Sequence, residues 1–217
     1  PDITVTPVLS TPSAGANALK VAPASLDPAR GYVLVRLGER TPDVWNYLVL
    51  APYDEAKEDI QGRGRAKANA VPKGADKQVT IGTKPFIAEE PHVRTYIVAL
   101  TPGRYVVAAS PTTCFCLGSF SVDVAPGKIT DLGSIYIGAE NGSSPWAALA
   151  KLHSSSDIET RGYTVADAMV VVPAKEDTTV PPPIAALPRV LADYRPVRRF
   201  GNYSGLLVNR ALALGGQ

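Results

Sequence analysis

Cys114 and Cys116 are the residues of this 217-residue chain whose type and spacing most directly suggest chemistry. Residues i and i+2 of a β-strand point to the same side of the sheet. The two cysteines share the parity of Val122 and Val124 farther along the chain, which predicts that both sulfur atoms face the core. Three interpretations stay open: two small buried apolar side chains, a disulfide, or a soft-metal site for Cu(I).

Each of the two chemical interpretations has a further requirement. A fully extended strand holds the Cα atoms of residues i and i+2 near the upper limit for a disulfide, roughly 6.8 Å, so that a bridge needs a bend in the backbone. A copper site needs more soft ligands than the two thiols, and the chain contains one Met and two His. We therefore expect no cofactor and no metal, and we keep Cys114 and Cys116 as a candidate disulfide or thiol pair.

The two histidines, His92 and His153, are the candidate acid–base groups. We expect His92 in a loop just before a strand and His153 at the C-terminal end of a helix. Neither lies beside a nucleophile in the sequence, and the chain contains no HExxH, G-x-S-x-G, P-loop or dinucleotide-binding motif. A hydrolase that uses His92 or His153 with a carboxylate and a hydroxyl stays an alternative, but the sequence favours a protein that is not an enzyme.

Arginine is concentrated near the end of the chain, where residues 184–217 contain five arginines and a single acid, Asp193. Arg195, Arg198 and Arg199 are candidate contacts with an anionic surface. Alternatively, their stems cover apolar surface while their guanidinium groups pair with acids of the sheet. The whole chain has 22 Lys and Arg against 20 Asp and Glu, a net charge of +2, which argues against a dedicated nucleic-acid-binding protein.

Six segments rich in β-branched and aromatic residues must position these groups, and they predict β-strands. They cover residues 32–37, 46–51, 94–100, 104–109, 120–124 and 132–137, and Pro52 is expected to end the second. Pro102-Gly103 separates the third strand from the fourth, and Pro126-Gly127 separates the fifth from the sixth. Pro followed by Gly fits the centre of a type II turn, so the two turns predict consecutive hairpins in an antiparallel meander.

Minor elements are expected in the two connecting regions. They are one or two helical turns over 54–59, short strands over 79–81 and 85–87, and helices over 144–152 and 164–169. The prolines at 181–183 are expected to end regular structure. The remaining residues, 184–217, are predicted to form an extended strap packed on the β domain.

The chain is thus divided into three parts. Residues 1–29 form a Pro-rich extended N-terminal arm, residues 30–138 form the β domain, and residues 139–217 form a helical segment followed by the Pro- and Arg-rich strap. Hydrophobic residues make up 45% of the chain, which is enough for a core. No apolar run approaches the length of a membrane-spanning helix.

Two segments resemble a known family of domains. The run Leu100–Val107 (Leu-Thr-Pro-Gly-Arg-Tyr-Val-Val) is similar to the central hairpin of prealbumin-like, or carboxypeptidase-regulatory-like, β-sandwich domains. The run Val124–Ile135 is similar to the end of the same domains. The whole chain resembles uncharacterised secreted or lipoprotein-like proteins of Gram-negative bacteria, in the Cys-Phe-Cys-Leu-Gly element and the Gly-Asn-Tyr-x-Gly element near its C-terminus.

The resemblance implies a mainly β fold: an antiparallel prealbumin-like β-sandwich over residues 30–138, with a short helical and extended C-terminal appendage. It also implies a periplasmic or cell-envelope location, with an export signal or lipid anchor upstream of Pro1. It implies no reaction, because such domains serve as accessory or adhesive modules. We therefore expect a non-catalytic interaction or structural module of the bacterial cell envelope, whose partner is an envelope protein or a glycan and not a nucleic acid.

Overall fold

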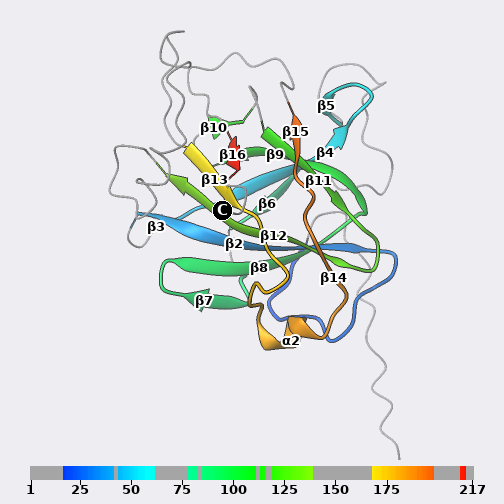
Figure 1. Cartoon of the computed structure of the whole chain (residues 1–217), viewed down its shortest axis with the longest axis vertical. Helices are drawn as coiled ribbons and strands as arrows, with labels where there is room; N and C mark the ends of the chain where they lie inside the picture. Colours follow the sequence, from blue (N-terminus) through cyan, green and yellow to red (C-terminus); the bar gives the residue numbers. More distant parts are fainter. Residues whose placement is uncertain are drawn as a thin grey trace, which may run out of the picture.

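The computed structural model describes residues 17–41, 44–61, 78–82, 85–110, 113–115, 119–138, 168–197 and 211–213. Two β-sheets account for most of this part of the chain, and a helix of four residues, α2 (Pro182–Ala185), is the helix found within it (Figure 1). The predicted mainly β class is therefore confirmed. No helix among the described residues is long and apolar enough to cross a membrane.

The first sheet has nine strands. They are β1 (Asn17–Ala18), β2 (Gly31–Thr41), β3 (Val44–Trp45), β7 (Ala88–Glu90), β8 (Val93–Leu100), β12 (Ile129–Gly138), β13 (Ala168–Val172), β14 (Arg189–Leu191) and β16 (Ala211–Ala213). The order is β1-β8-β2-β12-β13-β16, with β3 beside β2, β7 beside β8 and β14 beside β12. Because β12 runs parallel to β2 and β14, and β13 runs parallel to β16, the sheet is mixed, and the prediction of purely antiparallel sheets is wrong.

The second sheet has seven strands and curls into a half-barrel in which every pairing is antiparallel. They are β4 (Leu48–Asp54), β5 (Asp59–Ile60), β6 (Val79–Ile81), β9 (Gly103–Ser110), β10 (Thr113–Cys114), β11 (Ser119–Val124) and β15 (Arg195–Val197). The order is β15-β11-β9-β4-β5, with β10 beside β9 and β6 beside β4.

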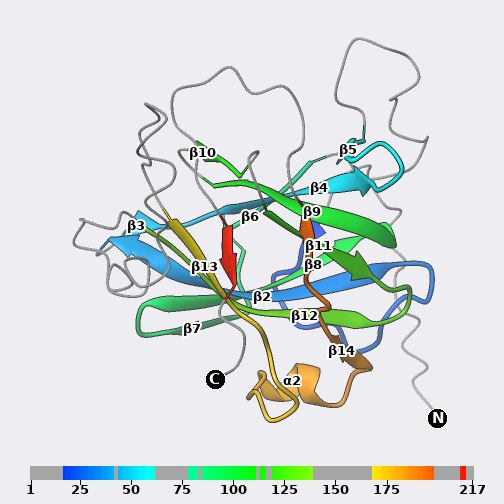
Figure 2. The same ribbon diagram turned by 45° about the horizontal axis from the view of Figure 1, so that its top comes forward.

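Alternate residues of both sheets form one apolar core between them. The first sheet contributes Val33, Val35, Leu37, Tyr96, Val98, Ile135 and Ile137, and the second contributes Leu48, Leu50, Tyr105, Val107, Val122 and Val124. The opposite face of the first sheet carries Tyr32, Leu34 and Ile97, which pack against Ile184 of α2. Figure 2 shows the resulting layers, with β4 and β9 above, β2 and β12 below them, and α2 beneath.

Both Pro-Gly turns connect one sheet to the other, so the predicted hairpins and meander are wrong. The turn at Pro102-Gly103 joins β8 of the first sheet to β9 of the second, and the turn at Pro126-Gly127 joins β11 of the second sheet to β12 of the first. A strand that is apolar on both faces must be covered on both faces and paired with neighbouring strands. Here β8 pairs with β2 in the first sheet, whereas β9 pairs with β4 and β11 in the second. The two turns lie close together, because Gly103 is opposite Val124 in the β9–β11 pair.

The six main strands and the short strand at 79–81 are confirmed, most with longer bounds than predicted. Pro52 does not end its strand, because β4 continues to Asp54 and Pro52 lies opposite Tyr105. The strand predicted over 85–87 is displaced to β7. The helical turns expected over 54–59 are wrong, because these residues form the tight connection of β4 with β5, in which Glu58 has a φ of 51°.

The C-terminal elements also differ from expectation. The helix predicted over 144–152 lies outside the described residues. The end of the predicted helix over 164–169 is wrong, because Ala168 and Met169 begin β13. The prolines at 181–183 do not end regular structure: Pro182 begins α2, where its missing N–H is not needed. Beyond α2, the strap lies on the first sheet as β14 and on the second as β15.

Candidate functional site

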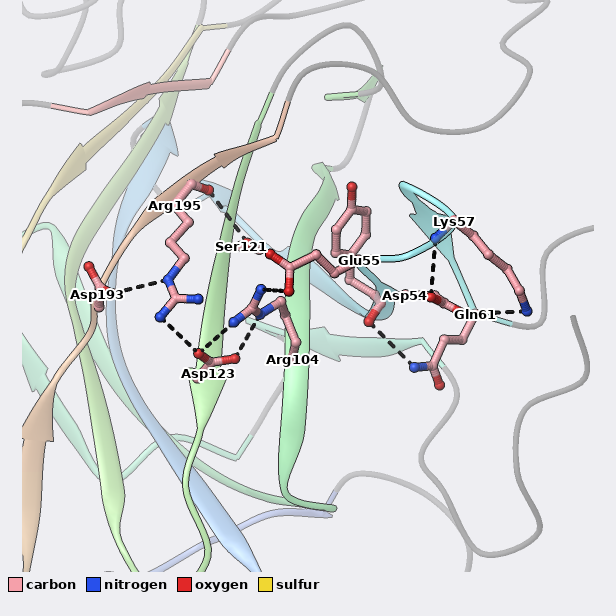
Figure 3. A network of polar contacts seen from close by, with 10 residues as sticks. Asp54, Glu55, Lys57, Gln61, Arg104, Ser121, Asp123, Asp193 and Arg195 are labelled. Atoms are coloured by element: carbon pink, nitrogen blue, oxygen red, sulfur yellow. Dashed lines mark hydrogen bonds and ion pairs between the residues drawn. The ribbon is translucent and has the colours of Figure 1, made fainter.

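A network of charged side chains lies on the outward face of the second sheet (Figure 3). Arg104 of β9 and Asp123 of β11 are directly opposite each other. The Arg104 guanidinium donates from Nε to Oδ1 of Asp123 at 2.8 Å and from Nη2 to Oδ2 at 2.9 Å. The carboxylate of Glu55, in the turn after β4, pairs with Nη1 of the same arginine. One guanidinium therefore links three elements of the sheet through two carboxylates.

The strap brings Arg195, one of the predicted anionic-surface contacts, into the same network. Its Nη2 lies 3.5 Å from Oδ2 of Asp123, and its Nε lies 3.1 Å from Oδ2 of Asp193. The guanidinium of Arg195 is thus paired with two acids. The other two candidates, Arg198 and Arg199, lie outside the described residues, and the proposed role of all three stays a prediction.

The pairing moves the protonation equilibria in the direction of the charged forms. The hydrogen bonds from Arg104 hold the pKa of Asp123 below its ordinary value against the opposing effect of burial, and the charges of Arg104 and Arg195 act in the same direction. The hydrogen bond to Asp123 likewise raises the pKa of Arg104. Burial raises the pKa of nearby Tyr53, and the negative charges of Glu58, Asp59 and Glu55 add to the effect. The charged pairs therefore join β9, β11, the strap and the turn after β4.

A second cluster surrounds Asp131 of β12, whose side chain is fully buried. Asp131 Oδ1 accepts from Arg36 Nη1 at 3.0 Å and from the main-chain N–H of Gly133 at 2.9 Å, and its Oδ2 accepts from Arg189 Nη1 at 2.8 Å. Each arginine uses its Nη2 to bind a main-chain oxygen of the turn after β13, Thr179 O at 3.0 Å and Glu176 O at 3.2 Å. One carboxylate therefore orients two arginines that fix this turn.

The strap is fastened beside Asp131 by further contacts. The main-chain N–H of Ala192 donates to Asp131 O at 3.0 Å, and the Tyr194 hydroxyl donates to Leu132 O at 2.6 Å. Burial, together with the charge of Asp131, raises the pKa of Tyr194. Because all of these groups are bound to other protein groups, we assign this cluster a structural role.

His92 is placed at the opposite end of the first sheet, in the turn between β7 and β8. Its Nδ1 contacts Oε1 of Glu39, the neighbouring residue on β2, and the main-chain N–H of Glu39 donates to His92 O at 2.8 Å. The Glu39 side chain is only 8% exposed, whereas the His92 side chain is 59% exposed. The backbone of His92 has a φ of 67°, in the left-handed region that a non-glycine residue rarely adopts. The contacts of the described residues thus bring His92 together with a carboxylate but not with the hydroxyl that the hydrolase alternative also requires, so this alternative stays a prediction.

Aromatic and polar side chains order this end of the sheet. The Arg94 guanidinium lies 3.8 Å from the ring centroid of Trp45 and 4.5 Å from that of Phe86, and it pairs with Glu89. The buried Asn46 donates from Nδ2 to Gly38 O at 2.9 Å and to Ile137 O at 2.7 Å. These contacts fix the end of β2 and therefore the position of Glu39 against His92.

The cysteine pair is described only in part. Cys114 lies in β10, where its backbone is opposite Ala109, but its side chain and the whole of Cys116 lie outside the described residues. Phe115 between them is fully buried in the core, a position that the parity argument did not foresee. The disulfide, thiol and copper interpretations stay predictions, and His153 also lies outside the described part of the chain. Within that part, His, Cys, Asp and Glu side chains form no group of three that is placed to hold a metal ion.

Two buried carboxylates, Asp131 and Glu39, were missed by the sequence argument. Asp131 lies between apolar strand residues, where an acid signals a buried charge that needs a partner, whereas Glu39 lies between Gly38 and Arg40, beyond the strand predicted over 32–37, and no local signal marked it. The sequence does not show the partners, because Arg36 and Arg189 are 95 and 58 positions from Asp131. The chain matches no protein-family model, and no curated protein or solved structure shows significant similarity to it.

Proposed function

We propose that the chain is a prealbumin-like β-sandwich that acts as an interaction or structural module at the bacterial cell envelope. Its role there depends on binding through its outer surface. The partner is an envelope protein or a glycan.

The observation that carries this proposal is the apolar filling between the two sheets. Alternate residues of β2 and β12 meet those of β4, β9 and β11, and their side chains are almost completely buried. A space filled in this way leaves recognition to the outward faces and the turns, where the charged side chains of the Arg104 network lie. The strap adds to the rigidity of that surface, because it is fastened to both sheets.

The charges narrow the kind of partner. Arg195 is neutralised by Asp123 and Asp193, so it offers little attraction to a polyanion. Glu55 and Asp193 are 72% and 76% exposed on the same face. A protein or a neutral glycan therefore suits this face better than an anionic polymer.

The test combines location with binding. A C-terminally tagged full-length gene product is followed by cell fractionation, and the purified chain is sedimented with isolated envelope fragments and with purified peptidoglycan. We expect the tagged product in the envelope or periplasm, and retention of the chain by envelope fragments. A product found in the cytoplasm, or a chain that stays in the supernatant with both probes, would overturn the proposal.

A matched pair of variants separates the surfaces. Arg104→Gln alters the network on the second sheet, and Arg198→Gln with Arg199→Gln removes two cations from the strap. Retention that falls only in the first variant supports the outward face of the second sheet as the binding surface. Retention that falls only in the second identifies the anionic contact predicted from the sequence.

A further inference from the structure

The contact between Glu39 and His92 decides which ring nitrogen of the histidine carries the proton. An ionised carboxylate only accepts hydrogen bonds, so Nδ1 of His92 must donate to Oε1 of Glu39. In the neutral imidazole the other nitrogen, Nε2, then holds a free lone pair. No hydrogen bond or ion pair of the described residues engages Nε2, and the ring is 59% exposed.

The surroundings hold the imidazole in this orientation. Glu39 is 92% buried and is fixed through its own main-chain N–H, which donates to His92 O at 2.8 Å. The backbone of His92 is kept at a φ of 67° by the pairing of Val93 with Gly38 on one side and Glu90 with Val93 on the other. Pro91 and His92 are the two central residues of this tight turn, in which a positive φ at the second position is ordinary, so the turn itself holds the ring beside Glu39.

We propose that His92 is a nucleophilic imidazole that accepts acyl groups from activated esters, with Glu39 as the carboxylate that orients the ring and exchanges its Nδ1 proton. This inference goes beyond the proposed binding role and does not depend on it. It departs from the expectation that the chain is not an enzyme, and it gives the hydrolase alternative a specific nucleophile. A serine is not needed, because the imidazole itself attacks when the leaving group is good.

The reaction balances without any co-reactant except water. Nε2 attacks the carbonyl carbon of the ester, and the bond to the leaving oxygen breaks, so that the oxygen departs with the electron pair. The acylated imidazolium then passes its Nδ1 proton to Glu39. Water attacks the acyl carbon, the carbon–nitrogen bond breaks, and Glu39 returns the proton to Nδ1. One proton of the water stays on the carboxylic acid and the other neutralises the departed oxyanion, giving one acid and one alcohol.

The experiment measures the release of 4-nitrophenolate from 4-nitrophenyl acetate by the purified chain. We expect His92→Asn to reduce the rate to that of buffer, because Asn tolerates the left-handed conformation but lacks a nucleophilic nitrogen. We expect Glu39→Gln to reduce the rate by about tenfold, the effect of losing a group that orients a reactive imidazole. Mass spectrometry of the acid-quenched protein is expected to locate the acetyl adduct on His92.

His153→Asn is the matched control, because it removes the other histidine of the chain. It should leave both the rate and the adduct unchanged. An equal rate in wild type and His92→Asn, a loss of rate in His153→Asn instead, or acetylation of lysines alone would each overturn the proposal. The His92→Asn variant is also sedimented with envelope fragments. If it is retained as wild type is, the loss of esterase activity is independent of the proposed binding role.

Discussion

Arg189 of β14 donates a hydrogen bond of 2.8 Å to the fully buried carboxylate of Asp131 on β12, and this contact joins the strap to the centre of the first sheet. The same carboxylate binds Arg36 of β2, so that strands from three regions of the sequence meet at one group. Removing only one partner from a buried group of an acid and two arginines lowers the stability of the fold strongly, because the charges that remain buried lose their opposite charge.

Asp131→Asn is therefore expected to lower the free energy of unfolding by about 3 kcal/mol, since it leaves two poorly exposed guanidinium groups without their counter-charge. Urea unfolding followed by circular dichroism measures the change. Asp193→Asn is the control, because the Asp193 side chain is 76% exposed. Its effect should stay within about 0.5 kcal/mol. Equal effects of the two substitutions would contradict the structural role of Asp131.

The pair of Arg104 and Asp123 predicts a dependence of stability on acid pH. The pKa of Asp123 is lowered in the folded state, chiefly by the hydrogen bonds from Arg104, so the unfolded state binds more protons at acid pH. The contribution is fully present above the ordinary Asp pKa of about 3.9 and is lost as the pH falls toward the lower pKa of the folded state. We expect the unfolding free energy of wild type to fall more steeply below about pH 4 than that of Asp123→Asn.

The size of this effect is limited by exposure, because the Asp123 side chain is 50% exposed. A double-mutant cycle of Arg104→Gln and Asp123→Asn is expected to give a coupling of about 1 kcal/mol or less at neutral pH, decreasing as salt is added. A coupling that is unchanged at high salt would show that the two side chains interact through packing and not through charge.

Gly133 is expected to tolerate no side chain. Its φ is +78°, and a Cβ atom built on it would lie 2.1 Å from Val172 O and 2.5 Å from Ala174 N. Since both are main-chain atoms of β13 and the segment after it, the chain itself would have to move. We expect Gly133→Ala to lower the unfolding free energy by more than about 2 kcal/mol, the sum of backbone strain and overpacking.

The variant Gly127→Ala separates the contribution of backbone strain from that of overpacking. Gly127 also has a positive φ, +63°, but its nearest neighbour to a built Cβ is Pro28 Cα at 3.4 Å. This variant should therefore show the strain alone, about 1–2 kcal/mol. If the two variants were equally stable, the close approach of β13 to Gly133 would have no energetic consequence.

The cysteine pair is tested by titration of thiols. If Cys114 and Cys116 are small buried side chains, both are expected to react with a thiol reagent only after unfolding, with no uptake of Cu(I) by the folded protein. Unfolding without reductant distinguishes the disulfide, which would give no reactive thiol. Rapid reaction of the folded protein, or binding of Cu(I), would contradict the burial that the sequence predicts.

The site of His92 shows how far sequence reasoning extends. The sequence places His92 just before a strand, with Glu89 and Glu90 as its neighbouring acids. In the folded chain the ring nitrogen contacts Glu39 instead, which is 53 positions away. The adjacent strands β2 and β8 create this contact, and their register follows from packing along their whole length.

The sequence by itself determined where the six main strands and the two Pro-Gly turns lie. Alternating apolar residues and β-branched side chains mark a strand through local preferences, and the Pro-Gly pairs mark turns through the backbone angles of two residues. Only the tertiary structure decided which sheet each strand joins. The hydrogen-bonding edges of all strands are alike, so pairing is selected by the burial of side chains on both faces, which depends on residues far apart in the chain. For this reason β8 and β9, joined by one short turn, belong to different sheets, whereas Tyr32 and Ile129 face each other on parallel neighbours.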